Sequence, residues 1–399
     1  MKKIINNIKY VKLKDVLGII FLILAIIPAM VFRIINKIKN RELWLICETS
    51  DTARDNGYHL FKYIREEHPN DMCYYAINKR CLDYKKIEKY GNIIQFSSLK
   101  HWIYYLAADK NISTQKGGNP SAPIFYVLQV YGILKNKRVF LQHGVIKDDL
   151  PYVHYKNAKF RLFVCGGKDE YIYIKNHFGY PENYVQYLGL ARFDNLYNNH
   201  INKKQIVIMP TWRNWLGRDV NKLSKKVDFR NTEYYKYWNG FLNNNEFKKI
   251  IESNNLVVYF YPHIHMQKFL QYFKSNSENI KIIDNSNIDI QDLLKESALM
   301  ITDYSSVFMD FAYMKKPIIY YQFDKEKFRK QHLATGYFSY ERDGFGEVVN
   351  DYDTLIERIN KYIKNDFKNE DVYIKRSENF FELHDNQNCK RNYEAIKNI

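Results

Sequence analysis

Short apolar runs alternate with stretches of helical periodicity along most of this chain. The apolar runs cover residues 43–47, 72–77, 139–142, 161–165, 205–209, 256–261, 280–283, 298–302 and 318–321. Between many of them, apolar residues recur every three or four positions, which predicts amphipathic helices. Strands that alternate with helices in this way predict mostly parallel sheets with helices on their faces.

The strands and helices fall into two successive series separated by a polar stretch at residues 198–204. A chain of 399 residues is also too long for one compact hydrophobic core. We therefore expect a first Rossmann-like domain over residues 42–200 and a second over residues 201–380. The tail, residues 381–399, is predicted to be a helix that packs back on the first domain.

Residues 1–41 differ in composition from the rest of the chain. They carry nine Lys or Arg and one acidic residue around an uncharged apolar run at residues 16–32. As a helix this run spans about 25 Å, slightly less than a hydrocarbon core of about 30 Å, and Pro28 is expected to kink it. We expect a membrane-associated helical segment, peripheral or monotopic on the cytoplasmic face of the cell membrane. A cleaved signal peptide is disfavoured, because the run is long and no clear cleavage site follows.

The formal net charge of +17 suits an anionic partner, which could be nucleic acid, anionic lipid or a phosphate-rich substrate. Net charge alone does not distinguish among these. Because no recognisable nucleic-acid-binding module is present, we expect no nucleic acid partner. The five cysteines are odd in number and form no C-x-x-C pair, which favours a reduced, cytoplasmic setting.

The segment ITDYSSVFMDF, residues 301–311, leads from a buried strand into a helix. Asp303, Ser305 and Ser306 are of the types that cap helices, and apolar residues follow at helical spacing. In a βαβ unit the helix begins at the carboxyl edge of a parallel sheet, where backbone N–H groups and the helix dipole favour anions. The segment is therefore a candidate phosphate site, and helix capping alone is the alternative.

This segment, with NIDIQDLLKES before it and KKPIIYYQFD after it, closely resembles the signature of the CDP-glycerol:poly(glycerophosphate) glycerophosphotransferases. That family contains teichoic acid and capsule polymerases. The resemblance is strong over residues 289–324, around His143-Gly144 and at PTWR, residues 210–213. It implies a GT-B-like fold, in which the two Rossmann-like domains face each other across a cleft.

The resemblance also implies which residues form the site. Those implied to be catalytic are His143, His263 and Asp310. Those implied to hold the donor are Arg213, Thr302, Asp303, Ser305 and Ser306. His143 would be the general base for the acceptor hydroxyl, since the pKa of imidazole lies near neutrality. A turn-forming histidine at position 143 and a surface arginine at position 213 are the alternatives.

The stretch VVYFYPHIHMQ departs from the family pattern, because Tyr261-Pro262 stands where His-Pro is usual. The family's second histidine then falls on His263, with His265 as the alternative. Two histidines at this spacing could also bind a metal. No third ligand and no Asp-x-Asp motif accompany them, so we expect no metal.

The resemblance implies transfer of glycerol phosphate, or a related polyol phosphate, from a CDP-linked donor to a hydroxyl group, with release of CMP. The acceptor would be a polyprenyl-linked glycan or polymer in teichoic acid or capsule synthesis. No cofactor is expected beyond the donor substrate, CDP-glycerol or a related CDP-polyol, and anionic membrane lipid is the further expected partner. The alternatives are a GT-B glycosyltransferase that uses a nucleotide sugar, and a non-catalytic, membrane-tethered binder of anionic polymer.

Overall fold

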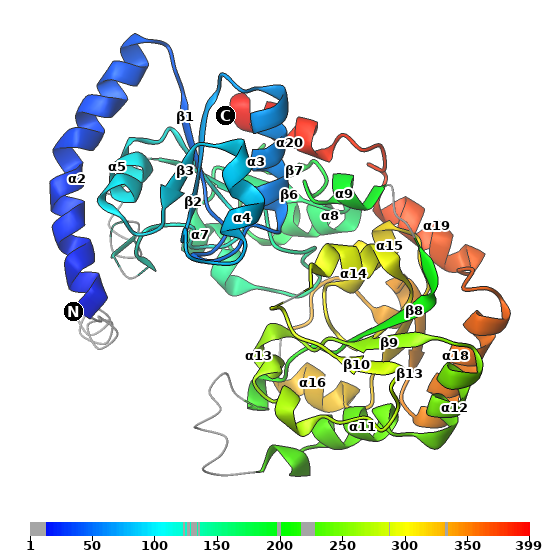
Figure 1. The fold of residues 1–399 in the computed structure, drawn as a ribbon. Helices are drawn as coiled ribbons and strands as arrows, with labels where there is room; N and C mark the ends of the chain where they lie inside the picture. The colour runs from blue at the N-terminus through cyan, green and yellow to red at the C-terminus, as the bar shows by residue number, and fades with distance from the viewer. Residues whose placement is uncertain are drawn as a thin grey trace.

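The computed structural model describes residues 13–122, 124–125, 128, 134, 136–197, 201–216, 228–286, 288–331 and 334–399. These residues form two α/β domains, each built on a parallel sheet, with one long apolar helix on the outer side of the first domain (Figure 1). The prediction of two parallel-sheet α/β domains and an apolar N-terminal helix is confirmed. Residues 1–12 of the predicted membrane segment and 198–200 of the predicted boundary lie outside the described residues.

The first domain has a seven-stranded parallel sheet in the order β3-β2-β1-β4-β5-β6-β7. Its strands are β1 (Leu43–Ile46), β2 (Met72–Ile77), β3 (Ile93–Gln95), β4 (Lys110–Ser113), β5 (Lys137–Phe140), β6 (Leu162–Cys165) and β7 (Val185–Tyr187). Its helices are α2 (Leu13–Ile38), α3 (Asn56–Glu67), α4 (Tyr84–Ile87), α5 (Leu99–Ala107), α7 (Tyr155–Ala158), α8 (Lys168–His177) and α9 (Phe193–Tyr197). The strand order reverses between β1 and β4, and this switch point is where doubly wound sheets bind ligands.

The second domain has a six-stranded parallel sheet in the order β10-β9-β8-β11-β12-β13, which reverses between β8 and β11. Its strands are β8 (Asn202–Met209), β9 (Val257–Phe260), β10 (Ile280–Ile282), β11 (Ser297–Thr302), β12 (Ile318–Tyr321) and β13 (Gly346–Val349). Its helices are α11 (Glu233–Leu242), α12 (Asn245–Ser253), α13 (Ile264–Gln267), α14 (Ile290–Glu296), α15 (Phe308–Tyr313), α16 (Lys325–Gln331), α17 (Tyr340–Asp343) and α18 (Tyr352–Lys364).

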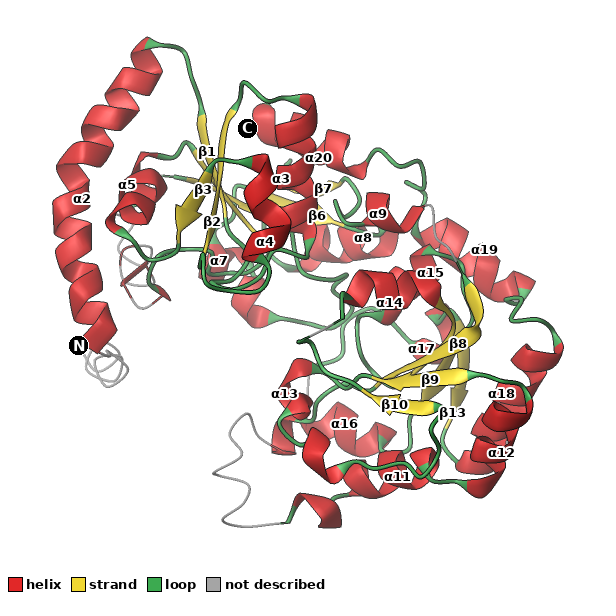
Figure 2. Ribbon diagram, in the orientation of Figure 1, coloured by secondary structure: helices red, strands yellow, loops and turns green. Residues whose placement is uncertain are grey.

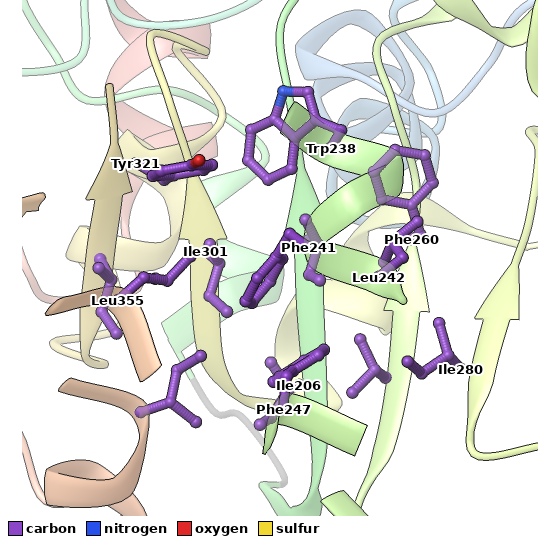
Figure 3. Packing of buried hydrophobic residues seen from close by; sticks show 14 of the residues in the cluster. Ile206, Trp238, Phe241, Leu242, Phe247, Phe260, Ile280, Ile301, Tyr321 and Leu355 are labelled. Atoms are coloured by element: carbon purple, nitrogen blue, oxygen red, sulfur yellow. The ribbon is translucent and has the colours of Figure 1, made fainter. Parts of the chain in front are cut away.

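Alternate residues of the central strands enter separate hydrophobic cores on the two faces of the second sheet. Ile206 and Ile208 pack in the core that contains α11, α12 and α18, whereas Val207 packs in the core that contains α14 and α15. Helices accordingly lie on both sides of the sheet (Figure 2). Figure 3 shows Trp238 and Phe241 of α11 packed over the strands in the first of these cores. This two-sided burial holds the carboxyl ends of β8 and β11 in place.

Two segments differ locally from the predicted pattern. The run at 139–142 leaves the sheet after Phe140, and Gln142 has a φ of 62° in the left-handed region. The helical stretch at 234–253 forms two helices, because Asn244 ends one turn and caps the next helix by accepting a hydrogen bond from the backbone N–H of Phe247 (3.0 Å). The first difference is important for the site, because it turns the chain directly before His143.

Helix α2 extends beyond the predicted apolar run at residues 16–32, and Pro28 lies inside it without ending it. A narrow face of small residues packs on the first domain, where Ala25 and Ala29 are buried and Phe32 contacts the ring of Tyr104 in α5 (5.1 Å between centroids). The remaining faces are apolar and exposed. By length and composition the helix could cross a membrane.

The chain returns from the second domain to the first through α19 (Asp371–Phe380) and α20 (Asn388–Lys397) (Figure 1). In α20, Cys389, Tyr393 and Ile396 pack in the core of the first domain. The ring of Tyr393 stacks on His68 directly after α3, with 4.0 Å between centroids. The last helix therefore ties the far end of the chain to the first domain.

Candidate active site between the two domains

A cavity of about 810 Å³ lies between the domains, at the carboxyl edges of both sheets. The first domain contributes loop residues that include Asp51, Arg54, Asp55, Arg80, His143 and Arg192. The second contributes Met209, Pro210, Tyr261, His263, Ser305, Ser306 and Asp310, among others. The cavity therefore adjoins the switch point between β8 and β11, and it brings together five of the eight residues predicted from the sequence.

The end of the ITDYSS segment is tied to the neighbouring strand β8. Thr302 Oγ1 donates a hydrogen bond to the carbonyl of Met209 (2.7 Å), and Asp303 Oδ1 accepts one from the backbone N–H of Thr211 (2.8 Å). Both side chains are fully buried and neither lines the cavity. Thr302 and Asp303, which were predicted to contact the donor, thus join β11 to β8 through their side chains and do not line the cavity.

Ser305 and Ser306 do line the cavity, between β11 and α15. Helix α15 begins at Phe308 with no side-chain cap from Val307, and Ser305 Oγ lies only at the limit of hydrogen bonding to the Val307 N–H (3.5 Å). Helix capping thus engages these hydroxyl groups weakly, and both face the cavity. Ser306 also lies near the first domain, since a Cβ atom placed on Gly144 would lie 3.3 Å from Ser306 Oγ.

Arg213, which was predicted to grip a phosphate, does not line the cavity. Its guanidinium is fully buried and forms two hydrogen bonds to Asp324 (2.7 and 3.0 Å) and an ion pair with Asp303 (2.9 Å). Burial alone would lower the pKa of Arg213, but the charges of Asp303 and Asp324 outweigh this effect and raise it. The arginine therefore holds Asp303, the first residue after β11, from the side away from the cavity. Its charge is balanced by the two aspartates.

His143 extends from the turn after β5, is exposed and lines the cavity. Its Nδ1 lies 3.3 Å from the carbonyl oxygen of Thr114. A carbonyl can only accept a hydrogen bond, so in the neutral imidazole the proton resides on Nδ1 and Nε2 has a lone pair. The structure therefore presents His143 in the tautomer that a general base requires.

Buried amide groups hold the His143 turn in place. The side chain of Asn56 donates to the carbonyls of Leu141 (3.2 Å) and Gln142 (2.8 Å) and accepts from the N–H of Arg192 (3.0 Å). The Gln142 amide donates to the carboxylate of Glu170 (3.0 Å). A left-handed conformation is unfavourable for glutamine, and these bonds are what stabilise it here. The position of His143 thus depends on residues far away in the sequence.

His263 lines the opposite side of the cavity and caps the short helix α13. Its Nδ1 accepts a hydrogen bond from the backbone N–H of His265 (3.2 Å). Neutral His263 therefore carries its proton on Nε2, the reverse of His143. The two histidines therefore differ in which ring nitrogen carries the proton.

Arg192 was not among the residues predicted for the site. It donates to both oxygens of Asp310 (2.6 and 2.8 Å) and to Asp55 (2.7 Å), so a buried ion-pair cluster joins the two domains at the cavity. Because Arg192 occupies both oxygens of Asp310, the geometry argues against Asp310 as a free catalytic base. The feature of the sequence that could have identified Arg192 is its position directly before a predicted helix in YLGLARFDNLY.

Arg80, after β2, is a second cationic residue that was not predicted from the sequence. It is exposed at the cavity, and within the described part of the chain no carboxylate pairs with it. Arg54, which also lines the cavity, is paired with Asp83. Arg80 is therefore the cavity cation best placed to meet an anionic ligand. No cluster of three or more metal-ligating side chains occurs among the residues that the structure describes.

Comparison with known proteins identifies a family that matches this chain. The family profile for CDP-glycerol:poly(glycerophosphate) glycerophosphotransferase matches residues 29–398. The minor teichoic acid biosynthesis protein GgaB of Bacillus subtilis (strain 168) is 33% identical over 380 residues, which are 93% of this chain and 41% of GgaB. A teichoic acid poly(glycerol phosphate) polymerase of Bacillus spizizenii (strain ATCC 23059 / NRRL B-14472 / W23) is 25% identical over 85% of this chain and 88% of its own length.

Among solved structures, the wall teichoic acid polymerase TagF superposes with a TM-score of 0.63 at 15% identity, covering 99% of each chain. This likeness concerns the fold. The match of the family profile covers both domains, the cavity and the last part of α2, from residue 29. The chain therefore belongs to the CDP-glycerol:poly(glycerophosphate) glycerophosphotransferase family.

Proposed function

We propose that this chain transfers glycerol phosphate, or a related polyol phosphate, from a CDP-linked donor to a hydroxyl group of a membrane-linked glycan or polymer. The observation that carries the proposal is that His143 of the first domain lines one cavity with His263, Ser305 and Ser306 of the second. The name of the family supports CDP-glycerol as the donor.

In this reaction, the acceptor hydroxyl oxygen bonds to the phosphorus atom that carries the polyol. The bond from that phosphorus to the bridging oxygen breaks, and CMP leaves with the bridging oxygen. Nε2 of His143 takes the hydroxyl proton, since its lone pair faces the cavity when Nδ1–H is bonded to Thr114. The turn held by Asn56 and Gln142 keeps the ring in this orientation.

Groups from both domains stabilise the diphosphate as its bridge breaks. The hydroxyl groups of Ser305 and Ser306, beside His263, supply hydrogen-bond donors from the second domain, and Arg80 of the first domain supplies positive charge. Donors that are fixed before the reaction lower the barrier, because they need no reorganisation when charge develops at the leaving oxygen. Arg213 acts indirectly, by holding Asp303 and the segment that follows it.

Replacing both serines, Ser305→Ala with Ser306→Ala, is expected to weaken CDP binding more than folding. A hydrogen bond to a charged group is worth about 1.5–3 kcal/mol, so two of them correspond to a loss of affinity of at least a hundredfold. Titration calorimetry with CDP measures this loss. The control variant Ser253→Ala replaces an exposed serine on α12, outside the cavity, and should bind CDP with the affinity of the native chain. Unchanged CDP affinity with a lowered melting temperature would mean that the serines only support the fold.

We further propose that α2 lies along the cytoplasmic face of the membrane. The helix packs on α5 from Gly18, next to Trp102, to Phe32, next to Tyr104. A helix docked in this way cannot cross the bilayer without drawing α5 into the hydrocarbon. Its exposed Ile and Leu side chains suit burial in one leaflet, and Arg33, Lys37 and Lys39 suit anionic headgroups.

Introducing two carboxylates on the exposed face, by Ile23→Asp and Ile27→Asp, is expected to detach the protein from anionic vesicles. These side chains are 63% and 72% exposed, so the substitution should leave the fold intact. Burial of each isoleucine in lipid is worth about 1.5–3 kcal/mol, so the partition coefficient onto vesicles should fall at least about a hundredfold. Co-sedimentation with anionic vesicles measures this binding. Ile172→Asp with Val372→Asp, two exposed apolar positions elsewhere, serves as the control. Equal sedimentation of both variants would refute the proposal.

The identity of the released nucleotide tests the reaction itself. The purified chain is incubated with CDP-glycerol, CDP-ribitol or UDP-sugars over extracted acceptor lipid, and the nucleotide product is identified. Release of CMP supports polyol-phosphate transfer. Release of UDP would instead indicate a nucleotide-sugar glycosyltransferase, and tight binding of anionic polymer without any nucleotide release would indicate a non-catalytic binder.

A further inference from the structure

A second cavity of about 680 Å³ lies at the switch point of the first sheet. Its walls are the segments that directly follow β1, β3 and β4, and one face of α2. Doubly wound sheets bind ligands outside the carboxyl ends of their strands at the switch point, so this cavity occupies the expected place for a ligand of the first domain. The transfer reaction described above assigns no group to it.

The chemistry of its walls favours a neutral, hydroxylated group over a phosphate group. Among the residues that the structure describes around it, none that lines it is Lys or Arg. Its acid, Glu48, accepts hydrogen bonds from the backbone N–H groups of Arg54 (3.1 Å), Asp55 (3.0 Å) and Tyr58 (2.8 Å), so this carboxylate is turned toward α3. The remaining walls combine amide and hydroxyl groups with aromatic rings, as in sites for sugar rings. They are Thr49, Ser50, Ser97, Gln115 and Asn119, with Phe21, Phe96 and Trp102.

The second cavity lies between α2, which is proposed to contact the membrane, and the loops near His143, the proposed base. Leu17, Gly18 and Phe21 of α2 form one wall. The loop after β1 lines this cavity with Thr49 and Ser50 and the first cavity with Asp51 and Thr52. Thr114, directly before Gln115 of the second cavity, accepts the hydrogen bond from His143 Nδ1 through its backbone carbonyl. A ligand anchored beside α2 would therefore meet His143 across one loop.

We propose that this second cavity binds an uncharged glycosyl unit of the membrane-anchored acceptor and so directs the acceptor's free hydroxyl toward His143. The inference rests on the proposed function, since it names the part of the acceptor that this domain recognises. The apolar tail of the acceptor remains in lipid beside α2, and its phosphate groups remain outside the cavity.

Two variants of the full chain in vesicles test the proposal kinetically. Gly117 lines the cavity, its φ is not in the left-handed region, and a Cβ placed on it meets no atom within 4 Å, so Gly117→Phe can fill the space. Asn119→Leu replaces an amide of the cavity wall by an apolar side chain of similar volume. With extracted acceptor lipid, we expect the KM for acceptor to rise about tenfold or more in Gly117→Phe, with the KM for CDP-glycerol unchanged. Gly117→Ala is the matched control and should behave as the native chain. Equal acceptor KM in all variants would overturn the proposal.

A second experiment decides the matter even if no transfer is found. A diazirine-bearing dodecyl disaccharide is photolysed with the full chain in vesicles, and labelled peptides are identified by mass spectrometry. We expect labels in residues 113–122 that Gly117→Phe reduces. A diazirine-bearing dodecyl phosphate, which lacks the sugar, should not label this segment. Labelling elsewhere, or equal labelling by the probe without sugar, would refute a glycosyl site, whereas correct labelling without nucleotide release would refute only the proposed reaction.

Discussion

Replacement of His143 by alanine is expected to remove most of the transfer activity while CDP-glycerol still binds. A positioned general base contributes about a hundredfold to ten-thousandfold in rate, so kcat should fall by at least a hundredfold. Binding should persist, because the serines and His263 that meet the donor belong to the second domain. Single-turnover kinetics measure the rate, and calorimetry with CDP-glycerol measures the affinity.

Two further variants separate the role of His143 from a loss of structure. His143→Asn keeps a polar group of similar reach but cannot take the proton, so it should be as slow as the alanine variant. His177→Ala, an exposed histidine at the end of α8, is the control and should keep full activity. If His143→Ala retains its rate within a few fold and its pH profile is unaltered, the base must be sought at His263, His265 or a carboxylate.

Replacement of Arg213 by methionine is expected to destabilise the second domain rather than to weaken donor binding selectively. The substitution would leave Asp303 and Asp324 buried without their cation, and breaking such a buried pair costs about 3–5 kcal/mol. Four aromatic rings surround this guanidinium, so water cannot readily replace it. Urea unfolding followed by tryptophan fluorescence measures the loss, because Trp238 lies in the core of this domain.

The control for Arg213 is Arg230→Met, which removes an exposed arginine paired with Asp228 at the surface. Surface pairs contribute little, so its unfolding midpoint should not change. Arg213→Lys keeps the charge but loses the two parallel hydrogen bonds to Asp324, and should lie between the native chain and Arg213→Met. If Arg213→Met is as stable as the native chain but binds CDP-glycerol weakly, the result would instead support the prediction that Arg213 contacts phosphate directly.

The sequence alone determined the fold class, most strand positions and the central motif. The runs at 72–77 and 318–321 coincide with β2 and β12, because strands buried on both faces must be continuously apolar. The apolar helix was equally evident, since its hydrophobicity is a local property of the chain. The resemblance of the sequence to the family implied His143, Ser305 and Ser306, and all three line one cavity because the strand ends of a parallel sheet meet at one edge.

Only the tertiary structure decided which polar groups pair with one another. Arg213 and Asp324 are 111 residues apart, and Arg192 and Asp310 are 118 residues apart, so no local pattern distinguishes a buried ion pair from a ligand contact. The tautomers of His143 and His263 likewise depend on single backbone groups, and the second cavity depends on the packing of α2 across the end of the first sheet. Hydrophobic periodicity encodes which side of an element is buried, whereas the partners of a buried charge depend on contacts between distant segments, which form only when the two sheets and α2 are assembled.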